Sequence, residues 1–175
     1  MILLLQVQLL EVQVAADNRL APYGALVLRV ALGAMYLAHS VVLKLMTLGL
    51  PGTADFFSKV GLPGWLAYVT FGAEAVGGVL LVLGIWTRAV AISLILPLIG
   101  AIIWVHAANG WVSTAQGGGW EYPAFLVAAS VAMALLGDGA YAVRRAADAA
   151  SGRNHRSQTH SLARSSFGFA WRIRA

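Results

Sequence analysis

Four apolar segments constrain the fold of this chain more than any other feature. They cover approximately residues 23–46, 65–86, 89–108 and 122–143. A helix that crosses the roughly 30 Å hydrocarbon core of a bilayer needs about 20 residues. Because lipid offers the backbone no hydrogen-bond partners, each segment is expected to be a membrane-spanning helix. The sequence therefore predicts an all-α, polytopic membrane protein built as a four-transmembrane-helix bundle.

Composition and the lack of cysteine narrow the class of protein further. Hydrophobic residues make up 59% of the 175 residues and charged residues 11%, which is more apolar side chain than a soluble domain of this length buries. The sequence has no cysteine, which excludes disulfides, iron–sulfur clusters and thiolate metal sites. We expect no covalently bound cofactor, so any redox chemistry would need a cofactor that is not attached to this chain.

The basic residues predict how the helices are oriented. Arg19, Arg88 and the arginines after residue 143 fall on one side of the expected bundle. Lys59 falls on the other side, and Lys44 lies near that second boundary. Loops rich in Lys and Arg stay on the cytoplasmic side. Both termini are therefore predicted to be cytoplasmic.

Three regions follow from these patterns. Residues 1–20 form an N-terminal extension that suits either a helix lying on the bilayer surface or a segment with no defined fold. Residues 21–145 form the four-helix membrane domain. Residues 146–175 are polar and basic, which predicts a disordered cytoplasmic tail that contacts anionic lipid.

Glu74 lies near the middle of the second apolar segment. Ten Leu, Ile, Phe and Val residues in that segment contribute about −3 to −6 kcal/mol to insertion, against about +2.5 to +3.5 kcal/mol for a central carboxylate. The helix can therefore insert despite the charge. An ionisable side chain at this depth normally faces the bundle interior and has a partner or a function.

Lys44 is the predicted partner of Glu74, with His39 as the alternative. All three side chains fall in the outer half of the bilayer when helical rise is counted along antiparallel helices. Helical side chains lean toward their own N-terminus, so Lys44 and Glu74 lean toward each other. One stripe of the first helix is expected to face the bundle, and it consists of Arg29, Gly33, Tyr36, Ser40 and Lys44.

Other polar residues gather in the same outer half. His106 ends the third segment, Asn109 follows it, and Glu121 precedes the fourth. We therefore predict one outer polar cluster that binds a ligand, consisting of His39, Lys44, Glu74, His106, Asn109 and Glu121. Within it, Glu74 and His39 are the candidates for proton transfer. No two of its His and Glu residues have the i, i+3 or i, i+4 spacing of a helical metal motif, so no metal site is expected.

Four residues are predicted to have structural roles. Gly77 and Gly78 would let a neighbouring helix approach closely. Arg29 is expected to snorkel to the inner surface, and Arg88 to cap the tight turn between the second and third helices. The loop of residues 108–123 contains three consecutive glycines, which suit either a mobile lid or an aromatic belt beside a flexible turn.

The order of polar residues hints at an internal duplication. Each predicted hairpin contains Arg, His, Glu and Gly in that order, first as Arg29, His39, Glu74 and Gly84, then as Arg88, His106, Glu121 and Gly137. The spacings differ between the two halves, so the repeat is loose.

Residues spread over about 19–143 also resemble the DoxX family of small four-helix membrane proteins. The resemblance is carried by Arg29 with Gly33 and Lys44, Gly61-Leu62-Pro63, Glu74 with Gly77-Gly78, Gly84 with Arg88, His106, Asn109-Gly110, and Gly119-Trp120-Glu121. It implies a four-helix bundle in the bacterial inner membrane. Members of that family include a subunit of thiosulfate:quinone oxidoreductase and a partner in a mycobacterial membrane oxidoreductase complex. Distant eukaryotic relatives are cargo receptors or assembly chaperones.

This resemblance and the polar cluster support two hypotheses about function. The first is a small subunit of a membrane redox complex that handles quinone, with His39 or His106 hydrogen-bonded to a quinone carbonyl and Glu74 moving protons. The alternative is a non-enzymatic assembly, chaperone or receptor protein. A small transporter is a weaker third hypothesis, because four helices leave little room for a path.

The expected partners follow from the same reasoning. They are membrane lipid, a protein in a membrane complex and a further copy of the chain, but no nucleic acid. Whether the chain is an enzyme is left open.

Overall fold

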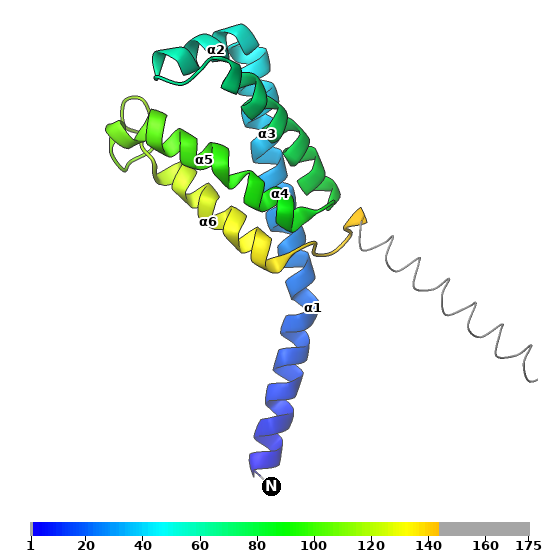
Figure 1. Ribbon diagram of the computed structural model, residues 1–175. Helices are drawn as coiled ribbons and strands as arrows, with labels where there is room; N and C mark the ends of the chain where they lie inside the picture. The colour runs from blue at the N-terminus through cyan, green and yellow to red at the C-terminus, as the bar shows by residue number, and fades with distance from the viewer. Residues whose placement is uncertain (1, 144–175) are drawn as a thin grey trace, which may run out of the picture.

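The computed structural model describes residues 2–143, and every regular element in that range is helical (Figure 1). The predicted all-α class is confirmed. In chain order the elements are α1 (Ile2–Leu37), η1 (Ala38–Thr47), α2 (Leu50–Lys59), α3 (Trp65–Leu83), α4 (Thr87–Ser93), α5 (Ile95–Ala101), η2 (Ile102–His106), η3 (Ala107–Asn109) and α6 (Glu121–Leu136).

Three stretches of the described chain are long and apolar enough to cross a membrane. They are Arg19–Thr47, Trp65–Leu83 and Thr87–Asn109. The chain is therefore a multi-pass membrane protein. A count of four spans and the orientation of the termini stay predictions.

The fourth apolar helix is shorter than the sequence predicted. We expected it to reach residue 143, but α6 ends at Leu136 and has 16 residues, or about 24 Å of helix. Gly137 ends it by adopting a positive φ of 82°, a conformation that favours glycine. The chain from Gly137 to Val143 then runs back against the first helix, where the Ala140 amide donates to the Pro22 carbonyl at 2.8 Å.

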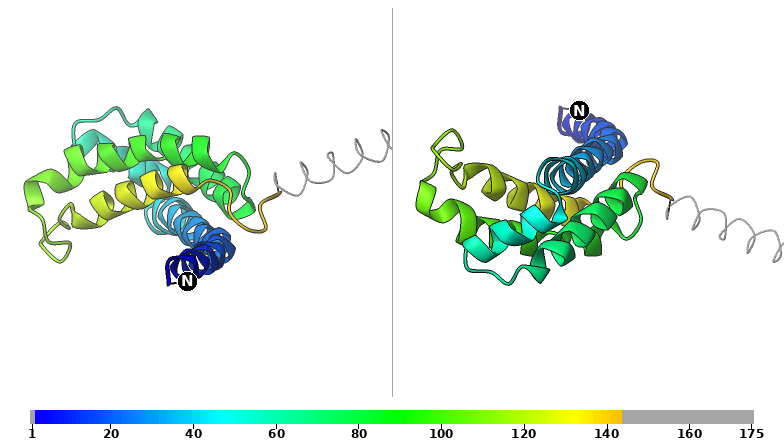
Figure 2. Two further views of the ribbon diagram at one scale, coloured as in Figure 1. Left: turned by 90° about the horizontal axis from the view of Figure 1, so that it is seen from below. Right: turned by 90° about the horizontal axis from the view of Figure 1, so that it is seen from above.

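The helices form two hairpins. In the first, α1 and η1 pack against α3, with α2 lying across their far end. In the second, α4 and α5 pack against α6, and η2 continues α5. The loops 48–64 and 110–120 lie at one end of the molecule, here called the loop end. The 84–86 turn and the chain after α6 lie at the other, here called the turn end. The hairpins are joined at the turn end and diverge toward the loop end (Figures 1 and 2).

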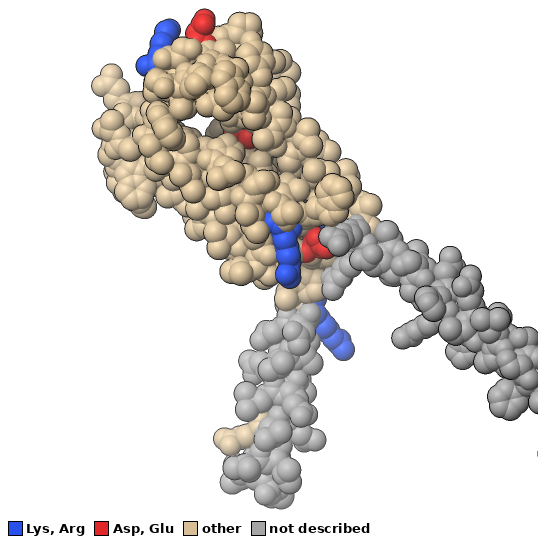
Figure 3. All heavy atoms as spheres, viewed as in Figure 1, with Lys and Arg blue, Asp and Glu red and all other residues tan. Residues whose placement is uncertain are grey.

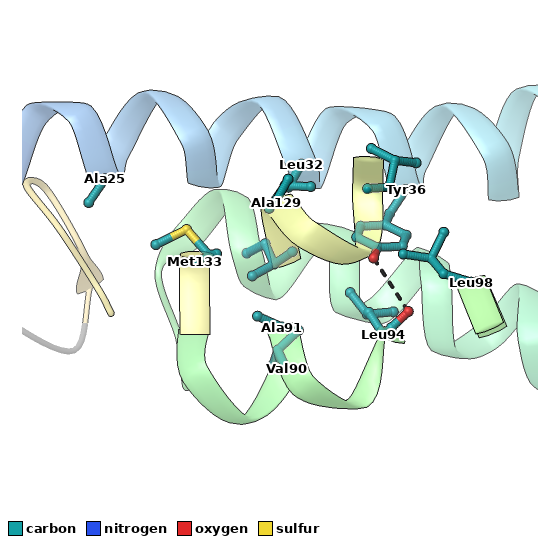
Figure 4. Packing of buried hydrophobic residues seen from close by; sticks show 11 residues of the cluster. Ala25, Leu32, Tyr36, Val90, Ala91, Leu94, Leu98, Ala129 and Met133 are labelled. Atoms are coloured by element: carbon teal, nitrogen blue, oxygen red, sulfur yellow. Dashed lines mark hydrogen bonds between the residues drawn. The ribbon is translucent and has the colours of Figure 1, made fainter. Parts of the chain in front are cut away.

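The core lies where the hairpins meet. Its buried apolar side chains come from α1, α3, α4, α5 and α6, together with Leu94 between α4 and α5, and Figure 4 shows them converging on one layer. They are Ala25, Leu32, Tyr36, Leu81, Val90, Ala91, Leu94, Leu98, Leu126, Ala129 and Met133. Tyr36 extends from α1 toward Leu94, so its ring spans the junction of the two hairpins.

Glycines permit the closest helix contacts, as the sequence predicted for Gly77 and Gly78. A β-carbon on Gly78 would lie 3.0 Å from the Gly33 carbonyl oxygen, and one on Gly33 would lie 2.8 Å from the Gly78 carbonyl oxygen. The backbones of α1 and α3 therefore cross at this pair, as small residues allow in membrane helices. Gly77 faces the second hairpin, where its β-carbon would lie 2.9 Å from Leu94.

Irregular helix geometry marks both hairpins near the loop end. The first helix widens into the π-helix η1, and the third apolar segment widens into the π-helix η2. π-helical turns are rare and occur often at functional sites. The break between α4 and α5 has a simpler cause, because Pro97 has no amide hydrogen for the Ser93 carbonyl and its ring crowds that carbonyl.

The chain ends relate differently to the predicted regions. Residues 2–20, expected to be an extension, form the first part of α1, which projects beyond the other helices at the turn end (Figure 1). The predicted cytoplasmic tail, residues 146–175, lies outside the described residues. The three-region division therefore stays a prediction.

Candidate functional site between the hairpins

Lys44 and Glu74 form an ion pair near the loop end. Lys44 Nζ donates to Glu74 Oε2 at 2.5 Å, and the side chains are 12% and 9% exposed. Lys44 lies in η1 and Glu74 in α3, so the pair joins the two helices of the first hairpin. The Lys44 carbonyl also accepts a hydrogen bond from the buried hydroxyl of Thr53, which ties α2 to the same place. The predicted pairing is confirmed, and Lys44 rather than His39 is the partner.

Tyr36 lies between this ion pair and the second hairpin. Its hydroxyl is hydrogen-bonded to Ser130 Oγ of α6 at 3.0 Å and to the Leu94 carbonyl at 3.4 Å. It also interacts electrostatically with Glu74 on one side and Tyr122 on the other. Sequence reasoning did not place Tyr36 or Ser130 in the site. The signal was the stripe of the first helix, on which Tyr36 lies two turns before Lys44.

His39 lies on the side of the first helix that faces α6. Its ring stacks on Tyr122 with 5.9 Å between ring centroids, and its Nδ1 lies 3.0 Å from the Met35 carbonyl oxygen. A carbonyl only accepts hydrogen bonds, so Nδ1 carries the proton and Nε2 is the acceptor of the neutral ring. Nε2 has no hydrogen-bond partner among the described residues. His39 and Lys44 thus lie on opposite flanks of Tyr36.

The divergence of the hairpins leaves a hollow above Tyr36. Figure 3 shows the surface hollowed between α2 with the start of α3 and the loop-end part of α5 and α6, with acidic atoms visible inside it. This hollow, together with Tyr36, the Lys44–Glu74 pair and the His39–Tyr122 pair, is here called the cleft. Two polar pairs join the helices here: the ion pair joins η1 to α3, and the His39–Tyr122 pair joins η1 to α6.

His106, Asn109 and Glu121, predicted to belong to the same cluster, instead bind the 110–120 loop. His106 Nδ1 donates to the Gly118 carbonyl at 2.9 Å, and Asn109 Nδ2 donates to the carbonyls of Gly117 and Gly118. Glu121 Oε1 accepts from the hydroxyl and amide of Ser113 at 2.5 and 2.9 Å. The predicted single cluster of six is therefore two groups, a cleft group and a loop group.

These contacts fold the loop against the helix ends beside it. Gly117 and Gly118 both adopt positive φ, which lets their carbonyls turn toward Asn109. Trp111 and Trp120 pack edge to face with 4.3 Å between ring centroids. The hydroxyl and amide of Ser113, in that order of effect, hold the pKa of Glu121 below its usual range. Glu121 therefore stays ionised and anchors the loop.

Arg29 is buried, which corrects the prediction that it snorkels. The residue is 1% exposed, and its guanidinium donates from Nη1 to the Asp138 carbonyl at 3.0 Å and from Nη2 to the Ala140 carbonyl at 3.2 Å. A β-carbon on Gly84 would overlap Nη1, so the space for the guanidinium exists because residue 84 is glycine. The chain that returns after α6 supplies the partners that water was expected to supply.

The second hairpin has a matching contact at the turn end. A β-carbon on Gly137, the residue that ends α6, would lie 2.9 Å from Arg88 Nε. In each hairpin, therefore, an arginine of the first helix lies over a glycine with positive φ that follows the second. Arg88 thus lies at the end of α6 as well as beside the 84–86 turn. The loose repeat has a structural counterpart, and the cleft lies between its two copies.

Comparison with known proteins decides the family. The sequence model of the DoxX family matches residues 24–107. A protein of Bacillus subtilis (strain 168) with the name "Putative oxidoreductase CatD" is 37% identical over 120 residues, which are 69% of this chain and 84% of that protein. The chain belongs to the DoxX family. No solved structure matches it.

The family match covers the residues that the first hairpin contributes to the cleft of this DoxX protein. His39, Lys44 and Glu74 lie inside the matched range, whereas Tyr122 and Ser130 of α6 follow it. The residues that form the ion pair therefore lie in the part of the chain that the family model matches.

The cleft of this DoxX protein offers proton transfer and hydrogen bonding. Among the described residues no group of three or more His, Cys, Asp or Glu could hold a metal ion. The cleft does combine a carboxylate, an ammonium, an imidazole and two phenols near apolar helices. Such a site suits a flat, lipid-soluble molecule with polar groups on its ring.

Proposed function

We propose that this DoxX protein is a small subunit of a membrane redox complex in the bacterial inner membrane, and that it holds a lipid-soluble quinone in the cleft. The observation that carries the proposal is the largely buried Lys44–Glu74 ion pair between two apolar helices. Ionisable side chains within a membrane span are costly to insert, so those that are present usually have a functional role.

The fit of a quinone rests on the residues of the cleft. A quinone is a flat apolar ring with two polar oxygens, and the cleft places polar groups on both flanks of Tyr36 with apolar helices around them. The exposed tryptophans at the loop end, Trp104 and Trp111, offer flat apolar surface for the approach of such a ring. Glu74 would exchange protons with the ring, and His39 would hydrogen-bond to it.

A redox partner is part of the proposal. The sequence has no cysteine, and the described residues hold no metal-binding group, so electrons would come from or go to a cofactor on another subunit. The name of the Bacillus subtilis relative contains the word oxidoreductase, which supports redox chemistry as the class of function.

The test uses membranes that contain the intact complex. His39→Phe leaves the ion pair intact, so it should abolish reduction of a short-chain quinone analogue while the amount of assembled protein stays unchanged. Glu74→Gln leaves Lys44 unpaired and lowers the amount of folded protein, so its turnover is measured per assembled complex and should also be abolished. Glu121→Gln is the matched control, because this carboxylate belongs to the loop group and should leave turnover unaffected. Normal turnover in both cleft variants would remove the redox proposal.

A second candidate function is a non-enzymatic assembly or chaperone protein, in which the polar groups hold the bundle together. The observation in its favour is that Lys44 and Glu74 already pair with each other, and that His106, Asn109 and Glu121 are used by the loop. On this alternative the cleft variants would reduce the amount of assembled complex, with turnover falling only in proportion.

A further inference from the structure

The line of buried residues on the first helix changes its spacing where η1 begins. In α1 it advances by 4, 3 and 4 residues, close to the roughly 3.6 residues of an α-helical turn. Its members there are Ala25, Arg29, Leu32 and Tyr36. Beyond Tyr36 it continues through the buried Ser40 to Lys44, each four residues after the last. A steady interval of four needs a turn wider than the α-helical one, and η1 supplies it as a π-helix.

An α-helix over the same residues would turn Lys44 away from Glu74. Such a helix advances about 100° per residue, so Lys44, eight residues on, would point about 80° away from the direction of Tyr36. Leu43, seven residues on, would point within about 20° of that direction. In the structure Leu43 is 43% exposed, whereas the Lys44 side chain is 12% exposed and contacts Glu74. The π-helical geometry of η1 therefore decides that Lys44, and not Leu43, faces the bundle interior.

Thr53 of α2 binds the end of this π-helix. In the i→i+5 pattern the Gly49 amide would be the donor to the Lys44 carbonyl, but Gly49 adopts a positive φ of 71° and leads into α2. The Thr53 hydroxyl is the donor instead, 3.1 Å from the Lys44 carbonyl oxygen and 2.9 Å from that of Gly49. Thr53 is 1% exposed, so bulk water does not reach this contact.

The Thr53 contact also comes from outside the first helix. Ser40 and Thr47 donate to carbonyls of that helix as well, but both residues belong to η1 and move with it. Thr53 belongs to α2, and α2 packs against α3. The hydroxyl therefore fixes the backbone of Lys44 relative to the helix that carries Glu74.

We propose that Thr53 is a positioning residue for the Lys44–Glu74 pair, because its hydroxyl holds η1 in the π-helical form that brings Lys44 to Glu74. Without the hydroxyl, the Lys44 carbonyl regains a donor when the Leu48 amide leaves its present acceptor, the Leu43 carbonyl at 3.0 Å, for the i→i+4 pattern of an α-helix. That change turns Lys44 off Glu74. The inference rests on the proposed function only where it connects the ion pair to turnover.

The first test measures the reactivity of the Glu74 carboxyl group on the full chain in mild detergent. A lipid-soluble carbodiimide modifies protonated carboxyl groups in membrane spans, whereas a carboxylate held by an ammonium has no proton and reacts slowly. Mass spectrometry gives the rate of modification at Glu74. The variant Lys44→Met sets the rate for an unpaired Glu74.

Thr53→Val keeps the size of the side chain and removes the hydroxyl. Glu74 should then be modified roughly tenfold faster than in the wild type, because a buried carbonyl has lost its donor in the π-helical form. Thr53→Ser restores the hydroxyl and should restore the wild-type rate. Thr53→Ala, which leaves space for a water molecule beside the same carbonyls, replaces Thr53→Val if that variant does not assemble, and Glu74 should again react faster than in the wild type.

Two further variants separate positioning from a general loss of stability. Ser58→Ala removes another hydroxyl of α2, whose hydrogen bond to the Ala54 carbonyl stays within that helix. Asn109→Ala removes the hydrogen bonds that the loop carbonyls of Gly117 and Gly118 accept. Both variants should keep the wild-type rate of modification at Glu74.

The second test follows the rotation of η1. The sequence has no cysteine, so Leu43→Cys introduces a single thiol. With Thr53 intact, this thiol should react readily with a lipid-soluble maleimide, as the exposure of Leu43 indicates. Combined with Thr53→Val, it should react more slowly, because the α-helical form turns residue 43 inward.

The outcomes for this inference and for the proposed function are distinct. A wild-type rate at Glu74 in Thr53→Val, beside a fast rate in Lys44→Met, would overturn the role of Thr53 and leave the quinone proposal standing. A protected thiol at residue 43 with Thr53 intact would overturn it as well. Faster modification of Glu74 in Thr53→Val, with unchanged quinone reduction per assembled complex, would support the role of Thr53 and count against the proposed function.

Discussion

Removing one charge of the Lys44–Glu74 pair should destabilise the protein far more than removing both. The two atoms lie 2.5 Å apart, and the side chains are 12% and 9% exposed, so a charge left alone keeps little contact with water. Breaking a buried pair in this way typically costs about 3–5 kcal/mol of unfolding free energy. We expect the lower end of that range, because the hollow leaves part of each side chain exposed and the remaining group can neutralise itself.

The double variant Lys44→Met/Glu74→Gln should lie within about 1–2 kcal/mol of the wild type, because it leaves no uncompensated charge. If each single variant loses about 3 kcal/mol, the pair has a coupling energy of several kcal/mol, at or above the upper end of those measured for residues in contact. Reversible unfolding in mixed micelles of mild and denaturing detergent gives the three free energies. Lys59→Met is the control, since this exposed lysine of α2 should change stability by less than about 0.5 kcal/mol.

Additive losses in the two single variants would refute the reasoning. They would mean that the two groups are screened by solvent, as exposed ion pairs are, whose coupling is about 0–1 kcal/mol. The cleft would then be wetter than the exposures of its side chains indicate.

Three other predictions follow from the fold. Gly78→Leu should lower unfolding free energy by at least about 1–3 kcal/mol, because its side chain would enter the crossing of α1 with α3, whereas Gly72→Ala has nothing within 4 Å of the added carbon and should be neutral by the same measurement. Tryptophan fluorescence of the 110–120 loop should change on acidification: the lowered pKa of Glu121 means that its stabilisation is present above the ordinary value of 4.5 and is lost as pH falls through the lower folded value. Reporter fusions after Ala150 and within residues 116–119 should report opposite sides of the membrane, and a common side would contradict the topology.

The membrane class and the ion pair could be predicted because both depend on local geometry. Length and hydropathy identify membrane helices without any knowledge of packing. Glu74 and Lys44 could be paired because helical rise fixes depth and the lean of side chains fixes direction. Neither argument needs the position of a third element.

The remaining features depend on chain segments whose paths the sequence does not reveal. Arg29 was expected to snorkel to the inner surface, but its partners come from the chain that returns after α6. His106 and Asn109 were expected in the same outer half as Glu74, but they bind loop carbonyls that turn toward them where Gly117 and Gly118 adopt positive φ. Depth alone therefore could not separate the loop group from the cleft group.

Photochemical labelling tests the central claim most directly. A quinone analogue with a photoreactive group on its ring would be added to native membranes, illuminated, and located by mass spectrometry of the purified chain. Labels should fall on η1, the middle of α3 and the start of α6, which supply the polar groups around Tyr36, and an excess of unlabelled quinone should prevent them. Labels confined to the turn end near Arg29, or labels that no excess of unlabelled quinone reduces, would contradict a quinone site between the hairpins.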